Sequence, residues 1–295
     1  MKPARPWHPL GLLLPTLLVL GVFFVYPLGL CAYRSLFAWD LLSEPRFVGS
    51  ANYRALVSSG QLAQIALRTL GYSVAVVAAS LTLGLALAVA LNRPGRLVAV
   101  VRAAVFSAYV VSWVAVALLW LWILDADAGL LSRSLRAIGL RGHDWLGNPD
   151  LALYSLAGVS VWKITGYAMV IFIAGLQDVP RSLYEAAALD GASPWRRFWH
   201  VTWPLLRPSA AFVGTTSLIL SFQAFDIVRV MTQGGPVRST TVFVYAIYEQ
   251  VFLNLRIGRA SALTVCFFVL LCAFTGLQLW SWRLASVRGV ARGGS

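Results

Sequence analysis

Two ionisable side chains, Lys163 and Asp226, fall within or at the end of long apolar stretches, where their charge must be compensated. Such groups face a water-filled cavity, a polar ligand or a partner within the protein. Lys163 could reach a phosphate, a hydroxyl or a carboxylate of a ligand, and Asp226 follows the aromatic Phe225. A structural ion pair or an interfacial position would satisfy either charge equally well, so both alternatives stay open.

No pattern of nucleophiles, general bases or metal ligands accompanies these residues. The chain contains no G-x-x-x-x-G-K-[ST] loop, no G-x-S-x-G elbow and no H-E-x-x-H pair. Its three histidines, His8, His143 and His200, lack metal-ligand spacing. We therefore predict no catalytic residue, no bound metal and no cofactor of its own. If ATP drives this protein, another chain must bind it.

The elements that must position these residues are membrane helices. The chain is 59% hydrophobic and 12% charged, and its mean hydropathy of +0.75 would leave a soluble domain with too much exposed apolar surface. A helix needs about 20 apolar residues to cross the hydrocarbon layer. The sequence predicts one all-α membrane domain over residues 1–295 with about six transmembrane helices. They span approximately residues 10–32, 70–91, 104–124, 151–176, 209–225 and 260–282.

The first apolar stretch has two interpretations. Lys2 and Arg5 precede it, as in a signal peptide, but the stretch is longer than the usual core of about 7–15 residues and lacks a clear Ala-x-Ala cleavage site. We interpret it as an uncleaved membrane helix. Pro15 and Pro27 within it predict a kink, because proline removes a backbone donor.

The formal net charge of +13 does not indicate a nucleic-acid-binding protein. Its basic residues are scattered over loops and helix ends, without the dense patch or stacking platform that nucleic acids require. A charge excess at membrane surfaces is the better explanation. If the N-terminus is cytoplasmic, basic residues occupy segments on both sides, so charge alone gives little support for an orientation.

A polar and aromatic insert over residues 181–208 has its own structural signals. Ser182 followed by Glu185 fits a capping box and predicts the start of a short helix. Asp190 and Gly191 predict a turn, since glycine tolerates a positive φ. Ser193 and Pro194 then predict a second helix, with serine as its cap and proline in its first position. The insert is predicted to be a helix–turn–helix.

The second helix of this insert should have an aromatic face. Trp195, Phe198, Trp199 and Thr202 share one side by their spacing. This face could lie against the membrane boundary or the helix bundle, or the segment could be only an amphipathic linker with aromatic anchors.

At these residues the chain resembles the permease subunits of ABC importers, whose cytoplasmic loop contains E-A-A, a glycine and an apolar tail ending in proline. Two other segments resemble the carbohydrate-uptake branch of that family: Phe47-Val48-Gly49 with Asn52-Tyr53, and Thr232 to Pro236 followed by Ser239-Thr240. Ser50 departs from the leucine common in the first segment. The matching loop residues are Glu185, Ala186, Ala187, Asp190, Gly191, Ala192, Phe198, Pro204 and Pro208.

The resemblance implies a transport role and a set of partners. The cytoplasmic loop would dock into an ATPase subunit, with Glu185 supplying charge, the alanines permitting close approach, Gly191 making the turn and Phe198 filling a pocket. Glu185 has a rival role as a helix cap. The implied partners are a second, homologous permease chain, two ATP-binding cassette subunits that bind ATP and Mg²⁺, an extracytoplasmic solute-binding protein and the lipid bilayer.

The implied function is that of an alternating-access permease subunit for a sugar, a polyol or a sugar phosphate in a bacterial or archaeal cytoplasmic membrane. Lys163, Phe225 and Asp226 then become possible substrate-path residues. A secondary transporter or channel is the alternative, although it would usually need more spans or an internal repeat. A membrane-embedded enzyme would require the acid, base or metal cluster that the sequence lacks.

Overall fold

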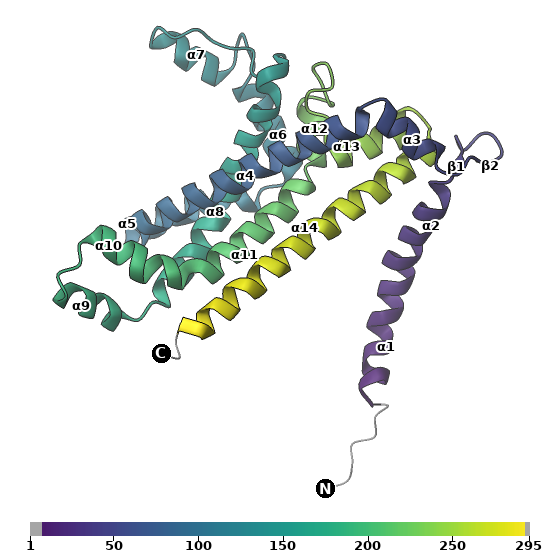
Figure 1. Ribbon diagram of the computed structural model, residues 1–295. Coiled ribbons are helices and arrows are strands. Elements are labelled where there is room, and N and C mark those ends of the chain that lie inside the picture. The colour runs from purple at the N-terminus through teal and green to yellow at the C-terminus, as the bar shows by residue number, and fades with distance from the viewer. Residues whose placement is uncertain (1–7, 293–295) are drawn as a thin grey trace. The chain divides into compact units, whose positions relative to one another are not determined.

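The computed structural model describes the backbone of residues 8–292 and the side chains of residues 12–278 (Figure 1). Lys2 and Arg5 lie outside the described residues. Most of the described chain is helical, in agreement with the predicted fold class. Its internal contacts define two units, one made of Met1–Gln64 with Ala246–Ser295 and one made of Ile65–Tyr245.

The first unit begins with an interrupted apolar helix. A π-helical turn, Gly21–Val25, separates α1 from α2 and lies just before Pro27. The side chains from Leu12 onward are largely exposed, as expected for a surface that faces lipid. The other elements of this unit include a two-stranded hairpin and a long final helix that packs on α2 and α3. Their bounds are α1 His8–Leu20, α2 Tyr26–Arg34, β1 Phe37–Ala38, β2 Arg46–Phe47, α3 Ala51–Ser58 and α14 Ile257–Arg292.

The hairpin of this unit is held by Asn52, a residue of the first family-like segment. Its amide donates to the carbonyl oxygens of Ser35, at 2.8 Å, and of Phe37, at 2.9 Å. Gly258 at the start of α14 lies so close that a Cβ there would overlap the carbonyl of Phe37. The absence of a side chain at Gly258 therefore lets α14 begin directly against the hairpin.

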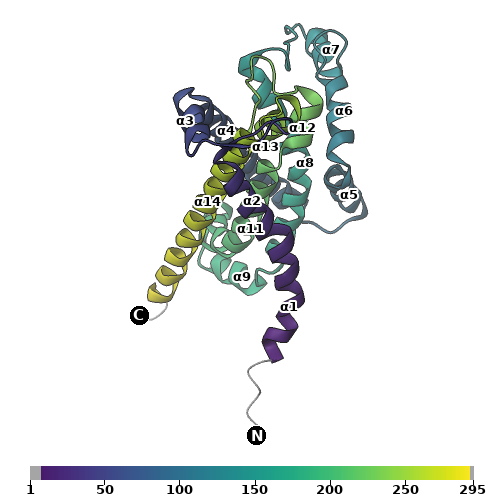
Figure 2. The same ribbon diagram turned by 90° about the vertical axis from the view of Figure 1, so that its right-hand side faces the viewer.

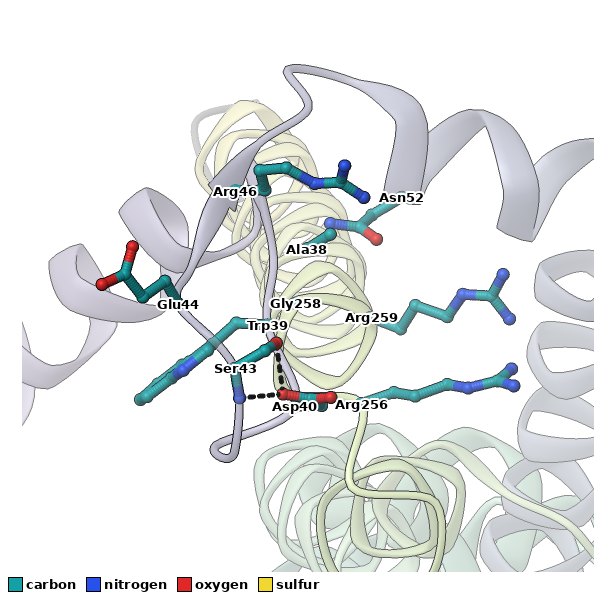
Figure 3. Close-up of a pocket in the computed structure, with 10 residues that line it drawn as sticks. All are labelled: Ala38, Trp39, Asp40, Ser43, Glu44, Arg46, Asn52, Arg256, Gly258 and Arg259. Atoms are coloured by element: carbon teal, nitrogen blue, oxygen red, sulfur yellow. Dashed lines mark hydrogen bonds between the residues drawn. The ribbon is translucent and has the colours of Figure 1, made fainter.

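A polar cavity of about 380 Å³ opens beside the hairpin (Figure 3). The side chains of Arg46, Arg256 and Arg259 extend toward one side of it, whereas Glu44 points away on the other side (Figure 3). Asp40 closes the turn between the strands. Hydrogen bonds from the Ser43 side chain and backbone lower the pKa of this carboxyl.

The second unit contains the remaining helices. α4 starts at the end of the first unit and continues into this one, and α13 starts in this unit and ends in the first. Short helices α6, α7, α9, α10, α12 and α13 separate longer ones (Figure 1). The bounds are α4 Gln61–Leu91, α5 Arg96–Val110, α6 Trp113–Ile123, α7 Leu130–Ala137, α8 Pro149–Gln177, α9 Arg181–Leu189, α10 Pro194–Arg197, α11 Trp203–Phe222, α12 Phe225–Met231 and α13 Phe243–Tyr248.

α8 is the central helix of this unit. In its most apolar window 72% of residues are buried, against 22% in α4 and 28% in Pro194–Phe222. It packs against α5 and α11, and one core cluster joins Ala168, Met169 and Phe172 of α8 to Ala88 of α4 and Val213 of α11. Asn148 caps the start of α8 by accepting from the Asp150 amide at 2.9 Å. α8 is therefore the most buried of the candidate spans that this unit contains.

Length and composition identify the helices that can cross a membrane. Five described helices are long and apolar enough to cross a membrane, namely Leu12–Arg34, Gln61–Leu91, Pro149–Gln177, Pro194–Phe222 and Ile257–Gln278. The predicted span 104–124 is wrong as a continuous helix. α5 and α6 meet there at an angle of 104°, and Val111 and Ser112 between them have extended backbone.

Gly84 provides a test of the central packing. A Cβ at Gly84 would meet the Cβ of Ala168 on α8, whereas a Cβ at Gly71 on the same helix would meet nothing. We expect Gly84→Ala to lower the unfolding free energy by about 1–3 kcal/mol through overpacking. The control Gly71→Ala should leave stability unchanged or raise it, because alanine favours helix. Thermal unfolding in mild detergent measures both, and equal stability of the two variants would contradict the close α4–α8 crossing.

Candidate functional site

The loop over residues 181–208 forms the predicted helix–turn–helix, with one correction at its start. α9 already begins at Arg181, with Pro180 in the N-cap position and no side-chain cap bond. Ser182 is therefore inside the helix, and the capping box predicted for Ser182 and Glu185 is wrong. Glu185 is exposed in the second turn of α9. Its side chain remains available for contact with another protein.

The glycine of this loop closes α9 by a Schellman turn. Gly191 has φ +71°, and its amide donates to the Ala188 carbonyl at 3.1 Å. The Ala192 amide donates to the Ala187 carbonyl at 2.9 Å. This pair of bonds satisfies carbonyls that a helix end otherwise leaves open. The spacing between the E-A-A triplet and the glycine thus follows from the geometry of a helix end.

The second half of the loop is continuous with a membrane helix. Ser193 caps α10 by accepting from the Arg196 amide at 3.4 Å, and Pro194 occupies its first turn, as predicted. A π-helical turn, Phe198–Thr202, then leads directly into α11. The Tyr184 hydroxyl of α9 lies 2.9 Å from the Thr202 hydroxyl. This bond ties the two arms of the loop together.

The tip of the loop presents an unusual exposed surface. Leu189 is 90% exposed and Trp195 is 70% exposed, although both are large apolar side chains. Trp195 therefore does not lie against the bundle, although its ring contacts those of Phe198 and Trp199. Of the predicted loop residues, the exposed ones are Glu185, Ala186, Asp190 and Gly191, and the half-buried ones are Ala187, Ala192, Phe198 and Pro204. These residues therefore lie on a loop whose tip is largely exposed.

The structure shows which groups Lys163 contacts, a question that the sequence left open. It is 2% exposed, and its Nζ donates to the carbonyls of Ala108, at 3.1 Å, and Tyr109, at 2.9 Å, and to that of Val111. Ala108 and Tyr109 belong to the last turn of α5, whose carbonyls lack helical partners, and Val111 follows that turn. The ammonium also lies 5.0 Å from the ring centre of Trp113. Lys163 thus caps α5 at the break in the third span.

The sequence did not predict the break between α5 and α6, because the apolar run over residues 104–124 is continuous. The single local signal is Ser112, a residue type that favours helix starts, between Val111 and Trp113. The partner that stabilises the break is more than 50 positions away in the chain. Such a contact has no local signature.

Phe225 and Asp226 lie on a different element from the Lys163 cap. α11 ends at Phe222, and both residues begin the short helix α12, where they are half-buried. α12 packs mainly against α6. Asp226 stands in the first turn of α12, where a carboxylate is favoured by the helix dipole. Lys163 is thus on α8, whereas Asp226 is on α12, which makes its main contacts with α6.

The second family-like segment is a closed loop. The Thr240 hydroxyl lies 2.8 Å from that of Thr232 and donates to the Gly235 carbonyl at 2.8 Å. The Tyr245 hydroxyl donates to the Gln233 carbonyl at 2.8 Å. Gly234, at φ +80°, has no space for a Cβ beside the Tyr245 ring. Glycine and threonine at these positions are explained by the internal bonding of this loop.

Comparison with known proteins agrees with this architecture. Residues 80–283 match the family model described as binding-protein-dependent transport system inner membrane component. The chain is 33% identical to the sn-glycerol-3-phosphate transport system permease protein UgpA of Agrobacterium fabrum over 92% of each chain. It is 32% identical to the sulfoquinovosyl glycerol transport system permease protein SmoG of the same organism, over 91% of this chain and 88% of SmoG.

Two crystal structures share the fold. One is a bacterial ABC transporter involved in import of the acidic polysaccharide alginate, with a TM-score of 0.79, 22% identity and coverage of 95% of this chain and 96% of that one. The other is the bacterial alginate ABC transporter in complex with alginate pentasaccharide-bound periplasmic protein, with a TM-score of 0.75, 21% identity and 93% coverage of each chain.

Replacing Lys163 tests its capping role. Lys163→Met keeps an unbranched side chain but leaves the α5 carbonyls without their donor, so we expect a loss of roughly 2–3 kcal/mol in unfolding free energy. Lys163→Arg keeps the charge and the donors, and should lose less. Thermal unfolding in mild detergent compares them. A methionine variant as stable as the unmodified chain would contradict the cap.

Replacing Gly191 tests the Schellman turn. A Cβ meets no neighbouring atom there, so Gly191→Ala should suffer only from the left-handed backbone, at a cost of about 1–2 kcal/mol. We expect faster amide exchange at residues 190–192, measured by hydrogen–deuterium exchange. Gly191→Asn should show a smaller increase, because asparagine tolerates this conformation. Unchanged exchange in the alanine variant would count against the turn.

Proposed function

This chain belongs to the family of binding-protein-dependent transport system inner membrane components, and we propose that a separate ATP-hydrolysing subunit drives it through the helix–turn–helix at residues 181–208. The chain is a multi-pass permease subunit of an ABC importer for a sugar or sugar phosphate in the bacterial inner membrane. Transport subunits of this kind are not enzymes.

The observation that supports the coupling proposal is the exposed tip of the helix–turn–helix. Glu185 offers a charge, Ala186 permits close approach, and Leu189 offers an apolar side chain that is 90% exposed. Large apolar side chains exposed on a polar loop are typical of protein interaction sites. An ATPase subunit with an apolar cleft and a basic rim would fit this surface.

The mechanism that follows is alternating access. ATP-driven closure of the ATPase pair would move α9 and α10, and α10 continues without interruption into the membrane helix α11. A shift of the loop would therefore tilt or displace α11. Such a movement changes the populations of inward-open and outward-open states through differential contacts at the loop.

The proposed assembly contains this chain and three other kinds of protein. A second, homologous permease chain completes the pore, two ATP-binding cassette subunits bind ATP and Mg²⁺, and a solute-binding protein delivers the solute on the opposite side of the membrane. The solute-binding protein agrees with the family description. Lys163 is not proposed as a solute contact, because its donors bind the α5 carbonyls. Phe225 and Asp226 remain proposed substrate-path residues.

Two substitutions test the coupling proposal. Gly191→Pro removes the amide that donates to Ala188, and Glu185→Lys reverses the charge of the docking surface without changing a span. We expect each to leave the chain in the membrane and to abolish ATP-driven uptake, measured with labelled sn-glycerol 3-phosphate in proteoliposomes. ATP hydrolysis should no longer respond to the solute-binding protein.

Ser182→Ala is the matched control, because Ser182 is exposed on the same helix and outside the family motif. Its uptake should equal that of the unmodified chain. Normal uptake by both test variants, or uptake that continues with a catalytically dead ATPase, would reject ATP-driven coupling and favour a secondary transporter or channel.

A further inference from the structure

A basic cavity of about 660 Å³ lies where the membrane helices α4 and α8 end and α9 begins. Three of its lining side chains are the arginines Arg93, Arg102 and Arg181. None of the described residues that line it is acidic, and Asp178, between two lining positions, does not line it. Three guanidinium groups without a lining carboxylate favour an anionic ligand.

Arg102 is partly committed to the fold. Its side chain donates to the carbonyls of Leu91 and Arg93, and so caps the end of α4. Arg93 and Arg181 are exposed at the cavity rim. These two side chains are free to adjust to a ligand, whereas Arg102 provides a fixed charge.

A second, more apolar cavity of about 390 Å³ adjoins the first. Both cavities share Asn92, Leu176 and Tyr184 in their walls. The second is also lined by Val89, Pro194 and Phe198. The basic cavity thus continues into the apolar cavity close to the ends of α4 and α8.

The same region contains a donor that the protein does not satisfy. Among the described residues, Nε of Arg197 is buried and has no hydrogen-bond partner, and Arg197 lines the apolar cavity. A buried donor without a partner costs about 1–3 kcal/mol. An oxygen-rich ligand between the two cavities would remove this cost.

We propose that the two adjoining cavities bind one anionic phospholipid. Its phosphate lies among Arg93, Arg102 and Arg181, its glycerol or ester oxygens face Arg197, and an acyl chain lies along Val89, Leu176 and Phe198. Basic pockets at the ends of membrane helices suit such headgroups. The lipid would touch the base of the helix–turn–helix, and thereby stabilise its position.

The combination of charge and apolar lining distinguishes this ligand from simpler anions. Free phosphate would use only the arginines, and an acidic protein segment would leave the apolar cavity empty. α4 and α8 end beside both cavities and cross the membrane by length and composition. The cavities are therefore at the depth where phospholipid headgroups occur.

The test is native mass spectrometry of the full-length chain, purified in mild detergent, stripped of lipid and titrated with palmitoyl-oleoyl phosphatidylglycerol or phosphatidylcholine. We expect a preference for phosphatidylglycerol that falls about tenfold in the double variant R93Q/R181Q. The control R96Q/R207Q removes two exposed arginines that do not line either cavity, and should keep the preference.

Two further measurements distinguish a long-chain phospholipid from free inorganic phosphate as the ligand of the cavities. Excess inorganic phosphate and a short-chain phosphatidylglycerol should displace the long-chain lipid poorly. Equal binding of the two long-chain lipids, equal loss in both double variants, or full displacement by inorganic phosphate would each overturn the proposal. None of these outcomes depends on ATP, so they leave the coupling proposal unaffected.

Discussion

The hydrogen bonds from Lys163 to the end of α5 are the interaction on which the membrane part of this structure depends. Lipid offers no water to the carbonyl groups at the break between α5 and α6, so the protein itself must satisfy them. A buried ammonium from α8 does so at three carbonyls. Gly166, one turn further along α8, lets the backbone of Val105 and Phe106 approach closely. As a result α5 and α8 are joined along their length.

This joined pair gives the proposed coupling a physical route. α8 leads through Pro180 into α9, and the Tyr184–Thr202 bond connects α9 to the helix that continues as α11. A displacement of the helix–turn–helix would therefore act on α8 and α11 together. Because α8 is fixed to the break by Lys163, the same displacement would extend to the bend between α5 and α6. Lys163 would thus connect the helices that the proposed coupling moves.

Local chemistry was predictable from the sequence, and long-range contacts were not. Gly191 and the Ser193-Pro194 start were predicted because each depends on its own backbone conformation and on neighbours within a few residues. The apolar runs likewise predicted long apolar helices, since the apolar composition of a helix is a local property of the sequence. The Lys163 cap and the Tyr184–Thr202 bond join distant positions in the chain, so no local sequence pattern predicts them. The capping box predicted at Ser182 was wrong because the helix already begins after Pro180, so the serine lies inside it.

The most direct test of this account is an experimental structure of the chain in its assembled transporter, at a resolution that places side chains. The account predicts that Nζ of Lys163 lies within hydrogen-bond distance of the carbonyls of Ala108, Tyr109 and Val111, with α5 and α6 bent sharply apart. A continuous helix over residues 104–124, with Lys163 directed into a solute-filled cavity, would contradict it.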